Sequence, residues 1–185
     1  MVPFGGVGVM LLGAVLAGLL AAPAGAGLAR RLGPVAGWAW AGLLWSLVVV
    51  ALVTLVPAQG APGWVPAEEA QTACSLDYGG PAPEGFWLFP GGQRALNAVL
   101  FVPSGALGVL ALARWRDARS VVVTVPVVVA ALAAYSVGIE AAQLVLARLD
   151  RACDVTDLVD NVAGAALGAL LGLLAAWALR PWRRR

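Results

Sequence analysis

Five stretches of this chain are apolar over roughly 20 residues or more, and this length restricts the fold more than any other feature. A helix rises about 1.5 Å per residue, so each stretch is long enough to cross the hydrocarbon core of a bilayer. The chain is 61% hydrophobic and only 12% charged, which is too apolar for a soluble domain. We therefore predict an all-α, polytopic membrane helical bundle forming a single domain, with spans at residues 5–28, 35–56, 95–113, 120–146 and 157–179.

The arginines predict the orientation of these spans. All 12 basic residues are Arg, and with the N-terminus outside only Arg94, Arg148 and Arg151 fall on the outer side. The others fall on the inner side, as expected when basic loops stay in the cytoplasm. They are Arg30, Arg31, Arg114, Arg116, Arg119, Arg180, Arg183, Arg184 and Arg185. We expect a multi-pass protein of the cell membrane with its C-terminus in the cytoplasm. No basic residue precedes the first apolar run, so we expect it to be a retained helix and not a cleaved signal peptide.

The long connection at residues 57–94 is predicted to lie outside the membrane. It is rich in Pro and Gly, and its aromatic residues favour a cap packed over the bundle, since long loops are usually either functional or disordered. It contains Cys74, and the other cysteine, Cys153, also falls on the outer side. Disulfides persist outside the cytoplasm, so we predict a Cys74–Cys153 disulfide. Two free thiols are the alternative, because spacing alone does not show proximity.

Polar residues gather at the predicted outer ends of the last three spans. Glu140 and Gln143 are three residues apart on one helical face, and Asn97 lies in the first turn of its span. An ionisable group at membrane depth costs at least ~2.5 kcal/mol on insertion scales, so it usually has a partner and often a function. We predict a single ligand-binding site open to the outer leaflet. Its residues are Asn97, Glu140, Gln143, Arg151, Asp154, Asp157 and Asn161.

Several of these residues also have a purely structural interpretation. Asp154 and Asp157 have the spacing of a helix N-cap and its N3 partner. Asn161 has an amide that would serve to bond neighbouring helices. Asp160 is expected to point toward headgroup water, since helix ends often carry solvated charge.

A glycine ridge is predicted to pack the last span closely. Gly164, Gly168 and Gly172 recur every four residues, the small-xxx-small pattern of closely packed membrane helices.

Glu140 and Arg151 are expected to lie close together, either within the ligand site or as a structural ion pair.

Two ligand chemistries fit the predicted site. A divalent cation would bind the oxygens of Glu140, Asp154 and Asp157, although no metal is assigned and no other cofactor is expected. Alternatively, Arg151, with Arg94 as a second donor, would bind a phosphate or carboxylate in a bidentate manner. The chain has no His, which excludes His-based triads and His-ligated zinc. A catalytic role is therefore less expected than binding, and nothing indicates a nucleic-acid partner.

Three motifs resemble those of the VanZ-like family, named after a protein associated with teicoplanin resistance. They are NAVLFVPSG at 97–105, SVGIEAAQ at 136–143 and RACDVTDLVDNVAG at 151–164, within a resemblance that covers residues 94–172. The resemblance implies a cell-envelope or glycopeptide context and points to the same seven site residues.

Three functions compete at this point. The favoured one is binding of an anionic lipid or lipid-linked envelope precursor by its headgroup at the outer leaflet, in envelope maintenance or glycopeptide resistance. The second is a metal- or carboxylate-dependent hydrolase or transferase acting on envelope lipids. The third is a structural accessory subunit of a membrane complex, in which the polar cluster only locks the bundle.

Overall fold

The computed structural model describes residues 5–57, 68–78, 92–146 and 152–181. Within these ranges the chain forms five long helices and a short 3-10 turn, η1 (Ser120–Val123), which leads into the fourth helix. The helices are α1 (Val7–Leu32), α2 (Pro34–Leu55), α3 (Gly92–Ala113), α4 (Thr124–Val145) and α5 (Val155–Leu179). All five are long and apolar enough to cross a membrane, so the predicted all-helical bundle is confirmed over the described residues. Its orientation in the membrane stays a prediction.

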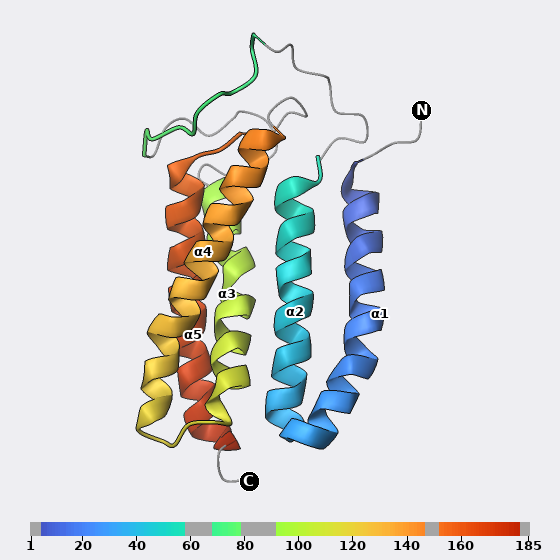
Figure 1. Ribbon diagram of the computed structural model, residues 1–185, viewed down its shortest axis with the longest axis vertical. Helices are drawn as coiled ribbons and strands as arrows, with labels where there is room; N and C mark the ends of the chain where they lie inside the picture. The colour runs from blue at the N-terminus through green and yellow to red at the C-terminus, as the bar shows by residue number, and fades with distance from the viewer. Residues whose placement is uncertain (1–4, 58–67, 79–91, 147–151, 182–185) are drawn as a thin grey trace.

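The helices run side by side in two groups, an α1–α2 hairpin and a unit made of α3, α4 and α5 (Figure 1). Gly33 makes the hairpin turn with φ of 84°, a conformation that favours glycine, and Pro34 follows at the start of α2. α1 continues to Leu32, beyond the predicted end at residue 28, so Arg30 and Arg31 lie in its last turn. Positive charge there complements the helix dipole. Residues 68–78, the start of α3, the end of α4 and the start of α5 all lie at the end opposite this turn (Figure 1).

Hydroxyl groups join the two groups of helices inside the bundle. The Ser46 hydroxyl of α2 lies 3.0 Å from the Ser104 hydroxyl of α3, and both side chains are buried. The Tyr135 hydroxyl of α4 donates a 2.7 Å hydrogen bond to the Leu47 carbonyl oxygen of α2. Polar groups in an apolar interior need such partners, so these bonds fix where the hairpin docks.

The glycine ridge of α5 packs directly on the backbone of α3, as predicted. Gly164, Gly168 and Gly172 of α5 face the backbones of Ala98, Val102 and Ala106 of α3, respectively. A Cβ at any of the three glycines would overlap a carbonyl oxygen of α3. The contacts advance in the same direction along both helices, so α3 and α5 run parallel. This close parallel contact, called the glycine seam below, brings short polar side chains at the two helix N-termini within reach of each other.

Candidate functional site

Asp154 caps the N-terminus of α5 and also connects this helix to α4. Its side-chain Oδ1 accepts a 2.7 Å hydrogen bond from the Thr156 backbone N–H, the bond expected of an N-cap. The Asp154 backbone N–H donates to Glu140 Oε2 on α4 at 3.0 Å. In a capping box the residue at N3, here Asp157, would take that N–H. Because Glu140 takes it instead, Asp157 is available to α3.

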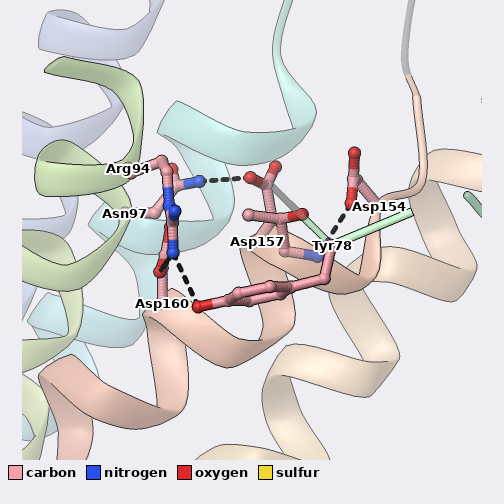
Figure 2. Close-up of polar contacts among 7 residues, drawn as sticks. Tyr78, Arg94, Asn97, Asp154, Asp157 and Asp160 are labelled. Carbon is pink, nitrogen blue, oxygen red and sulfur yellow. Dashed lines mark hydrogen bonds and ion pairs between the residues drawn. The ribbon is translucent and has the colours of Figure 1, made fainter. Parts of the chain in front are cut away.

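Asp157 pairs with Asn97 across the glycine seam. Asn97 Nδ2 donates to Asp157 Oδ1 at 2.6 Å, joining the first turn of α5 to the second turn of α3 (Figure 2). Asp157 also lies within electrostatic range of Glu140, Asp154 and Asp160, all of which carry the same sign of charge. The carboxylates are thus grouped at one end of the bundle and held mainly by hydrogen-bond donors.

Among the described residues, Arg94 and Asp160 form an ion pair at this end, so the expectation that Asp160 points toward headgroup water was wrong. Arg94 Nε and Nη2 bond the two Asp160 carboxylate oxygens at 2.9 and 3.0 Å, a bidentate pair. The Asp160 side chain is only 12% exposed, so it does not point into headgroup water. The physical reason is that α3 begins at Gly92, which places Arg94 inside the first turn and opposite Asp160.

Tyr78, from the segment before α3, adds a third contact to this pair. Its hydroxyl accepts a 2.8 Å hydrogen bond from Arg94 Nη2, and the guanidinium carbon lies 5.1 Å from the centre of its ring. Figure 2 shows Tyr78 reaching across to Arg94 and Asp160. Neither Tyr78 nor Asp160 was among the predicted site residues.

The two predicted carboxamides other than Asn97 lie between helices. Asn161 is buried and donates to the Ser136 hydroxyl of α4 at 2.9 Å, so its role as a bond between helices is confirmed. Gln143 is also buried and donates to the Thr54 carbonyl oxygen of α2 at 3.0 Å. Its Oε1 has no hydrogen-bond partner among the described residues.

The described part of the long connection is fastened to the α4–α5 junction. The predicted Cys74–Cys153 disulfide is confirmed. Beside it, Ser75 forms an isolated parallel bridge with Asp154, with Ser75 N donating to Cys153 O and Val155 N to Ser75 O, both at 3.0 Å. These contacts of the neighbours of Cys74 were not predicted from the sequence, although the predicted disulfide was a signal for them. The remainder of the predicted cap lies outside the described residues.

The structure thus brings together part of the predicted site. Asn97 contacts Asp157 and Glu140 contacts Asp154, whereas Asn161 and Gln143 contact other helices. Arg151 lies outside the described residues, and with it the predicted Glu140–Arg151 pair. In the part of the chain that the structure describes, no group of three or more acidic or cysteine side chains is arranged to hold a metal ion. The contacts among Tyr78, Arg94, Asn97, Glu140, Asp154, Asp157 and Asp160 are called the outer cluster below.

Comparison with known proteins gives one family. The model of the VanZ/LLP1 family matches residues 41–176, which is well over half of the chain and includes all helical residues of the outer cluster. α1 and the beginning of α2 lie outside the match. No curated protein and no solved structure matches the chain.

Proposed function

The chain belongs to the VanZ/LLP1 family of multi-pass membrane proteins, and from this we propose that its outer cluster binds the polar headgroup of a membrane lipid or lipid-linked envelope precursor. The observation that carries the proposal is the outer cluster itself. Three helices of an otherwise apolar bundle place ionisable side chains at one end, where each is expensive unless it is paired or used. With the predicted orientation, this end faces the outer leaflet of the cell membrane.

Arg94 is the group best placed to meet a phosphate. Its side chain is 43% exposed, and its Nη1 donates no hydrogen bond to any residue that the structure describes. A guanidinium engaged on one edge by Asp160 keeps its other edge for an anionic oxygen, and such charge-assisted bonds are strong. Arg151 is proposed as a second donor, on the strength of the sequence alone.

The carboxylates and carboxamides suit the rest of a headgroup. Glu140 and Asp157 accept hydrogen bonds from backbone and amide donors, and their remaining lone pairs are suited to hydroxyl or amine groups of a ligand. A lipid would place its tail against the exposed apolar surface of the helices, which includes Val99 of α3 and Val159 of α5. The proposed ligand class is therefore a phosphate-bearing headgroup with hydrogen-bond donors on an apolar tail.

Titration of the purified protein in detergent tests the proposal. Phosphatidylglycerol, phosphatidylethanolamine and a polyprenyl phosphate are added separately, and bound lipid is measured by native mass spectrometry. Arg151→Ala and Asp157→Asn should each weaken binding of the preferred lipid by about tenfold or more, since a hydrogen bond to a charged group is worth ~1.5–3 kcal/mol. Arg116→Ala, which removes an exposed arginine at the opposite end, is the matched control.

The outcomes separate the competing functions. If the variants fold normally and bind every lipid as the wild type does, the outer cluster has only a structural role in holding the helices together. Release of a cleaved headgroup during the titration would instead identify an envelope-lipid hydrolase. Binding that appears only with an added divalent cation would support the alternative in which Glu140, Asp154 and Asp157 bind that cation.

A further inference from the structure

Segment 71–78 is attached to the outer cluster more firmly than an ordinary loop would be. Gln71 pairs with both backbone groups of Cys153, its Nε2 donating to the carbonyl oxygen at 2.9 Å and its Oε1 accepting from the N–H at 2.7 Å. Together with the disulfide and the Ser75 bridge, this fixes the segment immediately before Asp154. The Gln71 side chain, the disulfide and the Ser75 bridge therefore all attach this segment to the residues just before α5.

This attachment carries Tyr78 to the other side of the outer cluster. Tyr78 follows Cys74 by four residues, and its hydroxyl meets Arg94 on α3. Arg94 is thus held by two partners, the Asp160 carboxylate on α5 and the hydroxyl and ring of Tyr78 beside it (Figure 2). Tyr78 itself is 58% exposed, so burial does not explain its position. Its position is explained by the attachment of the preceding residues Gln71, Cys74 and Ser75.

We propose that Tyr78 is a positioning residue for Arg94, and that the Cys74–Cys153 disulfide is what places Tyr78 there. Asp160 and Tyr78 together fix the plane of the guanidinium, so that its Nη1 edge is presented outward for an anionic oxygen. The hydroxyl supplies direction through its hydrogen bond, and the ring supplies a cation–π contact within the roughly 6 Å range of such interactions. This inference rests on the proposed function, because the anion it orients Arg94 toward is the lipid phosphate.

The disulfide contributes by limiting the conformations that segment 71–78 can adopt. Without the cross-link, segment 71–78 would be held at the α4–α5 junction by hydrogen bonds alone, in competition with water. A cross-link that closes a long loop removes conformations of the opened state. Loss of Cys74–Cys153 should therefore increase the fraction of time in which Tyr78 is away from Arg94.

Chemical modification of Arg94 tests the positioning without any lipid. The purified full chain is treated with phenylglyoxal, and modification of each arginine is followed by mass spectrometry, with exposed Arg116 as the internal reference. Tyr78→Ala and the double variant Cys74→Ser/Cys153→Ser should both raise the modification rate of Arg94 several-fold while leaving that of Arg116 unchanged. Tyr78→Phe keeps the ring and should give an intermediate rate.

Tyr135→Phe is the matched control. Tyr135 is the other tyrosine of the chain, and its hydroxyl bonds α2 within the bundle. Its loss should leave the Arg94 rate at the wild-type value. An Arg94 rate in Tyr78→Ala equal to that of the wild type overturns the inference, and Tyr78→Ala is an exposed change that need not affect folding.

Lipid titration of the same variants distinguishes this inference from the proposed function. A wild type that binds none of the three lipids, but in which Tyr78 protects Arg94, contradicts the headgroup function and leaves the positioning in place. A wild type that binds lipid with the same affinity after Tyr78→Ala and Tyr78→Phe contradicts the role of Tyr78 in binding. We expect lipid binding to be strongest in the wild type, weaker in Tyr78→Phe and weakest in Tyr78→Ala, with thermal stability unchanged.

Discussion

Replacement of Gly168 by Ala probes the glycine seam that brings the outer cluster together. An ideal Cβ at Gly168 would overlap the Val102 carbonyl oxygen of α3, and the clash is milder at Gly172, where the Cβ would lie 2.5 Å from the Ala106 oxygen. Ordinary contacts of this kind are 3.4–4 Å, so even the milder site requires the two backbones to separate by about 1 Å. Neither obstacle is a flexible side chain that can rotate away.

The expected cost follows from this geometry. Overpacking a close contact typically costs ~1–3 kcal/mol, and we place Gly168→Ala at the upper end because backbone meets backbone. The higher helix propensity of Ala offsets at most ~1 kcal/mol of this. Separation of α3 from α5 would also stretch the 2.6 Å bond between Asn97 and Asp157, so lipid binding should fall with stability.

Thermal unfolding in detergent measures the effect, with Gly138→Ala as the matched control. Gly138 lies in α4, and a Cβ there would meet nothing within 4 Å, so this variant should melt at or slightly above the wild-type temperature. Gly168→Ala should melt several degrees lower. Equal melting of Gly168→Ala and Gly138→Ala would refute the close packing of α3 on α5.

Three further predictions concern topology, helix capping and acid sensitivity. Reporter fusions after Arg31 and after Arg185 should both give a cytoplasmic signal, and an external signal from either would reject the predicted orientation. Asp154→Ala should destabilise the protein by ~1 kcal/mol in a melting assay whereas Asp154→Asn should not, because Asn also caps helices; equal losses would rule out the cap. Hydrogen bonds from Ser120 lower the pKa of Asp117, so this carboxylate stabilises the fold at neutral pH and loses that effect as pH falls through its lowered pKa. Ser120→Ala should move the pKa of Asp117 back toward its ordinary value in a carboxyl NMR titration, and an unchanged pKa would contradict the assignment.

The sequence predicted the bundle because its strongest signals are local. Apolar length sets the spans, and the ends of the predicted helices fall within a few residues of the observed ones. The glycine ridge and the Cys74–Cys153 disulfide were also recognisable, since each follows from a spacing or a compartment rule. These features require no knowledge of which helix neighbours which.

Asp160 shows what such rules leave out. Counting residues places it near the membrane surface, where solvation is the ordinary expectation. Its actual environment depends on the rotation of α5 about its axis and on the position of Arg94 on a parallel helix 66 residues away. The Arg94–Asp160 pair becomes predictable only once it is known that α3 is the helix that packs on the glycines of α5.

The contacts of Gln71 and Tyr78 were missed for a different reason. Both lie in a segment without helical or strand periodicity, so no pattern indicates where their side chains point. A disulfide at Cys74 restricts residues within a few positions of it to the neighbourhood of Cys153, and this was the available signal. It indicates proximity to the α4–α5 junction but not the bond from Arg94 to Tyr78.

Direct observation of the outer end of the bundle in lipid tests the central proposal. An experimental density map of the protein in nanodiscs that contain the preferred lipid should show a headgroup in contact with Arg94, near Asp157 and between α3, α4 and α5. The same map of the Asp157→Asn variant should lack that density while the helices remain in place. A wild-type map in which lipid is resolved only along the apolar flanks, with no headgroup at the outer cluster, would contradict the account.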